Sequence, residues 1–130
     1  MKPAYCYRVK YVSNWDGDTV RLSFDLGLGV WNKGEGGKGV AVRLHGIDTP
    51  ELRGGTDETK AQAKKAKEFV EEALLGASDI VVETFKDDTG KYGRYIAVVH
   101  YCMCPAEREE PWHNLNEDLV THGLAVKKEY

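Results

Sequence analysis

Four polar side chains lie close together in the stretch Val40 to Leu52, which reads V-A-V-R-L-H-G-I-D-T-P-E-L. Arg43 falls within an alternating, strand-like run, and Asp48, Thr49 and Glu51 cluster at the turn that follows. A guanidinium offers a planar pair of donors to phosphoryl oxygens, and carboxylates can hold a hard cation or accept a proton. The stretch therefore indicates a phosphate site, although a strand with one outward Arg and an ordinary polar turn explains it as well.

Two further segments carry matching chemical groups. The turn S-N-W-D-G-D supplies Asp16 and Asp18, and the run K-Y-G-R supplies Arg94. Each is ordinary by itself, because Asp-Gly is a common turn dipeptide and K-Y-G-R can simply open a strand. Together with Arg43 and the acids after it, they form the set that metal-assisted cleavage of a phosphodiester needs. That set comprises oxygen ligands for a cation, guanidiniums that stabilise charge at phosphorus and a base for a water proton.

Alternating hydrophobicity predicts the strands that must position these groups. Aromatic and β-branched residues alternate with polar ones in five runs bounded by turn residues. These runs cover Tyr7–Val12, Thr19–Phe24, Ala41–Gly46, Ile80–Phe85 and Arg94–Cys104.

Two helices are expected between and after these strands. An apolar stripe at helical spacing predicts a helix over Asp57–Leu75, capped by Thr56 or Asp57 and ended by Gly76. Asn116 is expected to cap a short helix that closes at Gly123. The order of elements indicates one α+β domain over residues 1–130, mostly β. A five-stranded barrel plugged by helices is favoured because it protects the strand edges.

Composition and charge limit the classes of function. The chain of 130 residues is 42% hydrophobic and 30% charged, as expected of a globular domain. No apolar run approaches the roughly 20 residues of a membrane span, and the N-terminus lacks an apolar signal core. We therefore expect a cytoplasmic protein with no membrane partner. A net charge of −3 argues against a broad, sequence-independent nucleic-acid surface, but not against a local phosphate site.

The motifs D-G-D-T, V-R-L-H-G-I-D-T-P-E, K-Y-G-R and N-E-D-L-V-T-H-G-L-A occur in this order, with a predicted helix between the second and third. In this arrangement the chain resembles the staphylococcal (micrococcal) nuclease, or thermonuclease, family from about Val12 to about Lys127. The resemblance implies an OB-fold barrel with two to three helices. It also implies a calcium-dependent endonuclease acting on DNA and RNA. Attack of water at phosphorus would release the 5′-oxygen and leave 3′-phosphate ends, and we expect a monomer.

The resemblance assigns roles to individual residues. Asp18 and Asp48 match the calcium carboxylates, and Thr49 matches a ligand that binds through its backbone carbonyl. Asp16 matches a neighbouring acid that acts around the metal and its waters. The catalytic set implied by the family is a general base and two phosphate-clamping arginines: Glu51, Arg43 and Arg94. Contacts to the substrate fall on Lys91 and Tyr92, with weaker candidates in Arg53 and Tyr130.

Two features depart from the family pattern. The Gly-rich segment 26–39 lengthens the connection before the third strand, and six glycines lie between Asp25 and Val40. It is expected to form a mobile hairpin, while the alternative is a flap over the substrate with Trp31 stacked on a base. The family's stacking tyrosine near the C-terminus also has no clear counterpart, since Lys128 and Glu129 precede Tyr130.

A second metal site is conceivable on the last predicted strand. His100, Cys102 and Cys104 alternate and would share one face, with His113 in the next loop, which is a possible zinc set. Same-face neighbours on a strand lie about 6–7 Å apart, which is wide for ligands of one ion. The three cysteines of the chain, an odd number, are more simply reduced thiols.

Two other classes of function are also compatible with the sequence. A non-catalytic nucleic-acid-binding module on the same fold is the first, and a protein-interaction domain is the second. The presence of every acid and arginine that the family's chemistry requires favours the enzyme.

Overall fold

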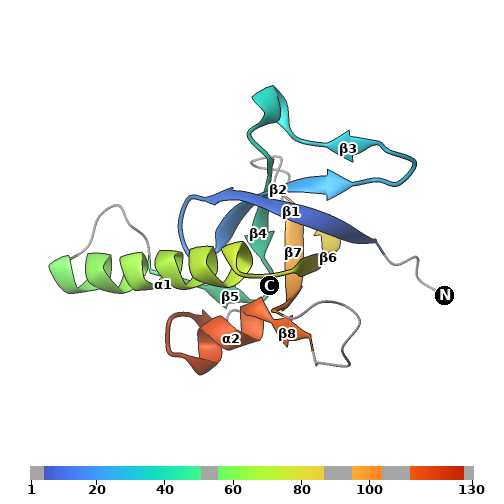
Figure 1. The fold of residues 1–130 in the computed structure, drawn as a ribbon. Helices are drawn as coiled ribbons and strands as arrows, with labels where there is room; N and C mark the ends of the chain where they lie inside the picture. Colours follow the sequence, from blue (N-terminus) through green and yellow to red (C-terminus); the bar gives the residue numbers. More distant parts are fainter. Residues whose placement is uncertain (1–4, 51–55, 87–94, 104–111, 128–130) are drawn as a thin grey trace.

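The computed structural model describes residues 5–50, 56–86, 95–103 and 112–127, and its core is the five-stranded closed barrel that the sequence predicts (Figure 1). Strand β1 pairs with both β2 and β6, β6 pairs with β7, β7 pairs in parallel with β4, and β4 returns to β2. This circuit leaves each barrel strand paired on both sides. The strands are β1 (Cys6–Asn14), β2 (Thr19–Asp25), β4 (Val40–Leu44), β6 (Asp79–Lys86) and β7 (Tyr95–Cys102).

Alternate residues of these strands fill the barrel. Val20, Leu22 and Phe24 of β2 point inward, as the period of two requires. Val42 and Leu44 of β4 are fully buried in the same core. The alternation is thus confirmed, although Ser23 is buried as well.

Helix α1 (Asp57–Leu75) has the predicted bounds and caps. The Thr56 side chain accepts a hydrogen bond from the Thr59 amide, and Gly76 follows the last turn. The helix packs on β1 through the predicted apolar stripe. Its buried residues are Ala63, Ala66, Val70 and Leu74.

Helix α2 (Leu115–Thr121) begins earlier than expected, and the predicted cap is wrong. Asn114, not Asn116, is the N-cap, and its side chain accepts from the Glu117 amide. Asn116 lies inside the helix and is buried. Its side chain accepts from the Val99 amide and donates to the carbonyls of His45 and Ala97, so it ties the helix to the barrel.

The third predicted strand is shorter than expected. Strand β4 ends at Leu44, and a turn follows in which Gly46 has a φ of 76°, a conformation that favours glycine. The chain then forms β5 (Ile47–Asp48), which pairs with β9 (Val126–Lys127) rather than within the barrel. The turn therefore directs Asp48 away from the line of β4.

The Gly-rich segment 26–39 is an arm with its own structure. A tight turn joins β2 to β3 (Trp31–Asn32), which pairs antiparallel with the end of β2, so the predicted hairpin is confirmed. A 3₁₀ turn, η1 (Glu35–Gly37), leads back to β4. In Figure 1 the arm rises from the barrel on the side away from α1 and α2. Strand β8 (His113–Asn114), which pairs with β7, is a further element that the sequence did not predict.

Candidate active site

Arg43 brings together two acids that lie far apart in the sequence. Its Nη2 atom lies 3.9 Å from Asp18 Oδ2 and 3.6 Å from Asp48 Oδ1. The pairing of β2 with β4 places Thr19 opposite Arg43, and the Leu44 amide donates to the Asp18 carbonyl at 2.8 Å. The pairing of β2 with β4 and the turn into β5 therefore bring together three of the residues that the sequence suggested for a phosphate and cation site.

The D-G-D turn is held in place by hydrogen bonds. The Asp16 carboxylate accepts from the amides of Asp18 and Thr19, at 3.1 and 2.9 Å. The Asn14 side chain donates to the carbonyls of Asp16 and Lys67, both at 3.1 Å, and so joins the turn to α1. These bonds fix the direction of Asp18 from both sides of the turn.

Gly17 is required at the centre of this turn by packing. A Cβ atom there would lie 2.7 Å from Ala66 Cβ and 2.9 Å from Thr49 Cγ2. Both distances are well inside normal contact, so a side chain would push the turn away from α1 and from Thr49. The glycine thus lets the segments that carry Asp18 and Thr49 approach each other.

Asp18 lies in a setting that disfavours its charge. The residue is 8% exposed, and its pKa is raised to about 7, first by burial and then by hydrogen bonding and charge repulsion from Asp16. The Arg43 guanidinium and a hydrogen bond with the Thr49 backbone oppose this shift. Burial is the main reason that the charged form of Asp18 is disfavoured, and a cation bound at this carboxylate would favour that form.

The donors at this site fit a hard cation in their chemistry. All are oxygens, the atom type that calcium prefers, and Thr49 is buried with an Oγ1 atom that has no hydrogen-bond partner among the described residues. Within the described ranges, no group of three or more His, Cys, Asp or Glu side chains could hold a metal ion. A cation at Asp18 and Asp48 would thus complete its shell with backbone oxygens, water or substrate.

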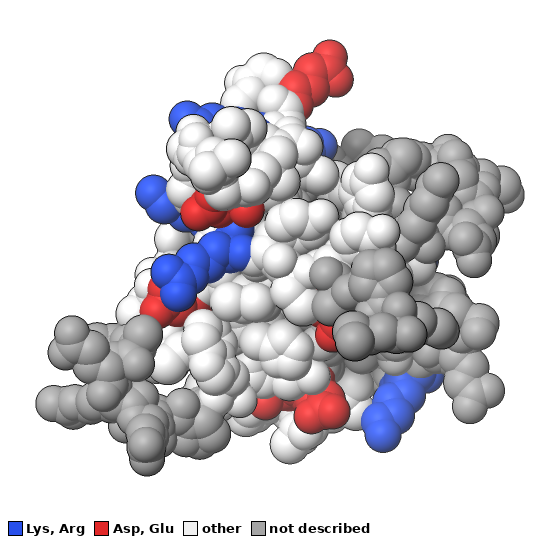
Figure 2. Space-filling model, turned by 90° about the vertical axis from the view of Figure 1, so that its right-hand side faces the viewer, with Lys and Arg blue, Asp and Glu red and all other residues white. Residues whose placement is uncertain are grey.

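A surface hollow adjoins Asp48. It has a volume of about 360 Å³, and it is lined by Asp48 and Thr49 together with Thr59 and Gln62 of α1 and residues 123–126. On the face drawn in Figure 2, Lys and Arg side chains appear as separate groups among acidic and neutral ones. Among the described residues drawn on that face, then, positive charge does not gather into one continuous patch.

Six residues with predicted roles lie outside the described residues. They are Glu51, Arg53, Lys91, Tyr92, Arg94 and Tyr130, and their roles stay predictions. Among the described residues, Tyr95 opens β7 and pairs with Val42, the residue before Arg43.

The possible zinc set gains no support from the described residues. Cys102 is buried, His100 is half-buried, and His113 is exposed with its ring stacked on Tyr101 at 5.1 Å. Cys104 lies outside the described residues.

The described residues form a mostly β, OB-like barrel with two helices. On this barrel one arginine lies between two acids. A family model described as staphylococcal nuclease homologue matches residues 41–130, more than half of the chain, and the protein therefore belongs to that family. A comparison with curated proteins found no match. The matched segment contains Arg43, Asp48 and Thr49 but begins after β1 and β2, so the link to Asp18 comes from the structure. No helix among the described residues is long and apolar enough to cross a membrane.

Proposed function

We propose that this protein is a calcium-dependent nuclease that hydrolyses phosphodiester bonds of DNA, RNA or both. The observation that carries the proposal is the convergence of Asp18 and Asp48 on one nitrogen of Arg43, within 4 Å in each case. Membership of the staphylococcal nuclease homologue family supports it. A cytoplasmic location and a monomeric state stay predictions.

Arg43 is the residue proposed to bind the phosphate. Its side chain is 22% exposed, so the guanidinium is held by the protein yet open to a ligand. A guanidinium presents two donors in one plane, which matches two phosphoryl oxygens. In this role it stabilises the charge that develops at phosphorus, as preorganised donors do in other transfers.

The groups proposed to hold calcium are Asp18, Asp48 and the Thr49 carbonyl. Asp16 is proposed to interact with the water molecules around the ion. When bound, the cation would supply a Lewis acid for a phosphoryl oxygen and lower the pKa of a bound water. By family resemblance, Glu51 is proposed to accept the water's proton and Arg94 to provide a second phosphate contact. The residues proposed to contact the substrate are Lys91, Tyr92, Arg53 and Tyr130. The products would bear 3′-phosphate ends.

A cleavage assay tests the proposal. End-labelled single-stranded DNA and RNA are incubated with the protein in calcium, magnesium, manganese or EDTA. We expect cleavage with calcium, none with EDTA, and fragments whose 3′ ends become extendable only after phosphatase treatment. An Asp18→Asn, Asp48→Asn double variant serves as the control for contaminating nucleases. Binding of nucleic acid without calcium-dependent cleavage would instead favour the non-catalytic module.

A further inference from the structure

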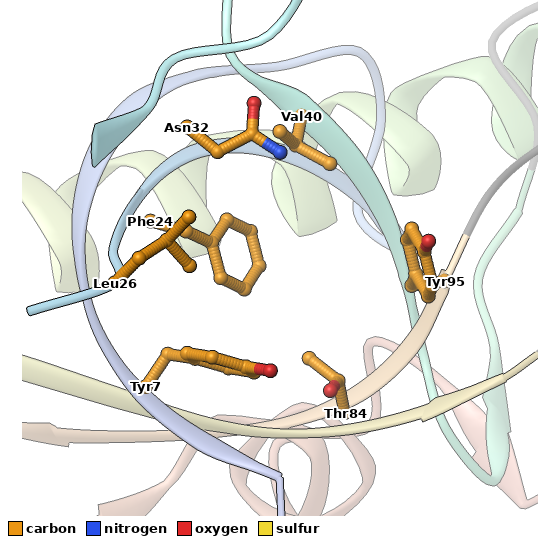
Figure 3. A pocket seen from close by; sticks show the side chains of 7 residues that line it. All are labelled: Tyr7, Phe24, Leu26, Asn32, Val40, Thr84 and Tyr95. Atoms are coloured by element: carbon orange, nitrogen blue, oxygen red, sulfur yellow. The ribbon is translucent and has the colours of Figure 1, made fainter. Parts of the chain in front are cut away.

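A pocket of about 160 Å³ lies at one mouth of the barrel and shares no residue with the Arg43 site. Each of the five barrel strands contributes to its wall, and the arm that carries β3 adds to its rim. Figure 3 shows the rings of Tyr7, Phe24 and Tyr95 around a common opening, with Asn32 and Thr84 at opposite edges.

The wall of this pocket is aromatic and uncharged. Tyr7 and Phe24 pack edge to face, with ring centroids 5.5 Å apart, and form its rigid floor. Tyr95 is 48% exposed and Asn32 is exposed, so both can contact a ligand without disturbing the core. Among the described residues that line the pocket, none is charged. Such a wall fits a neutral, flat molecule with hydrogen-bonding edges rather than a phosphate.

The size of the pocket suits one ring system. Sites for drug-sized ligands measure roughly 300–1,000 Å³, whereas a cavity of roughly 150 Å³ accepts a benzene ring. The Asn32 Oδ1 atom accepts a hydrogen bond from the Gly34 amide at 3.1 Å, so the side chain offers its Nδ2 group to a ligand, as a donor to an acceptor on a base edge. Stacking on aromatic side chains is also how proteins hold unpaired bases.

We propose that this barrel mouth is a subsite for one unpaired nucleobase of the nucleic-acid substrate. Val40 lines the pocket, and Arg43 lies three residues further along β4, about 10 Å along the strand and on its opposite face. A single strand of substrate that passes over this edge of the barrel can therefore place a base in the pocket one or more nucleotides away from the phosphate at Arg43. A base within a duplex is paired and stacked, so the subsite selects single-stranded or unpaired substrate. The identity of the ligand as a substrate base rests on the proposed nuclease function.

The role proposed for the Gly-rich arm differs from the alternative raised by its sequence, a flap with Trp31 stacked on a base. Trp31 does not line the pocket, and the Lys10 ammonium lies 5.1 Å from the centre of its ring. Successive residues of a strand face opposite sides, so Asn32 faces the pocket when Trp31 faces Lys10. The pairing of Asn32 with Phe24 holds the amide over the aromatic floor. The arm thus supplies an amide, not a tryptophan, to the base.

The test is an NMR titration of the isotope-labelled protein in EDTA with adenosine, guanosine, cytidine, uridine and thymidine. Nucleosides contain no phosphodiester, so binding is measured independently of hydrolysis. We expect saturable shifts at the amides of Phe24, Asn32, Thr84 and Tyr95 with at least one nucleoside. Ribose 5-phosphate, which has the sugar and phosphate without a base, should leave these amides unmoved.

Two variants and a control complete the experiment. Tyr95→Ala should raise the nucleoside Kd by roughly fivefold or more, the lower end of measured base-stacking effects. Asn32→Ala should raise it by roughly fivefold through the loss of one hydrogen bond. Leu28→Ala, on the exposed tip of the same arm and outside the pocket, should not change it. The spectra themselves show that each variant is folded. Any one of three results would overturn the subsite: no saturable shifts with any of the nucleosides, equal shifts with ribose 5-phosphate, or shifts that neither variant weakens. None of these results would alter the outcome of the cleavage assay, and a failed cleavage assay would not remove nucleoside binding.

Discussion

The guanidinium of Arg43 lies 3.9 Å from the carboxylate of Asp18, and this contact joins β4 to the turn that precedes β2. The hydrogen bond from the Leu44 amide to the Asp18 carbonyl holds the two backbones together beside it. Asp48 reaches the same guanidinium nitrogen from β5. The positions of the three groups thus depend on backbone pairing rather than on flexible side chains alone, which is the preorganisation that catalysis by charge stabilisation needs.

Arg43→Lys should reduce cleavage by about 10²-fold in kcat, by analogy with the loss of one oxyanion donor. An ammonium keeps the charge but cannot present two donors in one plane. The measurement is kcat on single-stranded DNA at saturating calcium. Arg21→Lys, an exposed position on β2, is the matched control and should behave as the unmodified protein. Near-normal turnover of Arg43→Lys would remove this residue from the mechanism.

Asp18→Asn should stabilise the metal-free protein at high pH. The pKa of Asp18 is raised from 3.8 to about 7, so the folded state binds this proton more tightly than the unfolded state does. The associated stability is present below about pH 4 and is lost as the pH rises through about 7. Asn cannot lose a proton, so the Tm of the variant relative to the unmodified protein should rise between about pH 5 and about pH 8 in EDTA. A Tm difference that is the same at both pH values would show that Asp18 ionises normally.

Gly17→Ala should destabilise the protein by about 1–3 kcal/mol, the usual result of overpacking. The new methyl group would meet Ala66 on α1 at 2.7 Å. Ala66→Gly alone should cost about 1 kcal/mol through helix propensity, but it should recover part of the loss when combined with Gly17→Ala. Urea unfolding of the single and double variants gives the coupling free energy. Additive effects would mean that the side chains at positions 17 and 66 are not in steric contact.

Asn116→Ala should cost roughly 2–4 kcal/mol of unfolding free energy, because it leaves several buried hydrogen-bonding groups without partners. The Val99 amide and the carbonyls of His45 and Ala97 all bond to this side chain. Glu117→Ala, at the next and exposed position of α2, is the control and should change stability by well under about 1 kcal/mol. A loss for Asn116→Ala as small as that of the control would contradict the structural role of this residue.

The barrel and α1 could be predicted from the sequence because both follow from local periodicity. Val20, Leu22 and Phe24 alternate, and the apolar stripe of α1 repeats at helical spacing between Thr56 and Gly76. The meeting of Asp18 with Arg43 could be suggested only by combining motifs, since the contact depends on the pairing of β2 with β4.

Other features depend on tertiary contacts that leave little local signal. Asn114 and Asn116 are both good capping residues by type, and only the burial of Asn116 against β7 decides between them. Strand β5 is two residues long and exists through its pairing with β9, so no periodicity could indicate it. The packing of Gly17 against Ala66 has the same origin. The pocket at the barrel mouth likewise gathers residues from every barrel strand.

The proposed cation site, formed by Asp18 and Asp48 beside Arg43, is tested most directly by calorimetric titration of calcium at about pH 8. The titration compares the unmodified protein with Asp18→Asn and Asp48→Asn. We expect one calcium ion bound per chain, with affinity lowered at least about tenfold by either substitution, since each removes a charged ligand. Calcium binding that is absent from the unmodified protein, or that both variants retain unchanged, would contradict the proposed site.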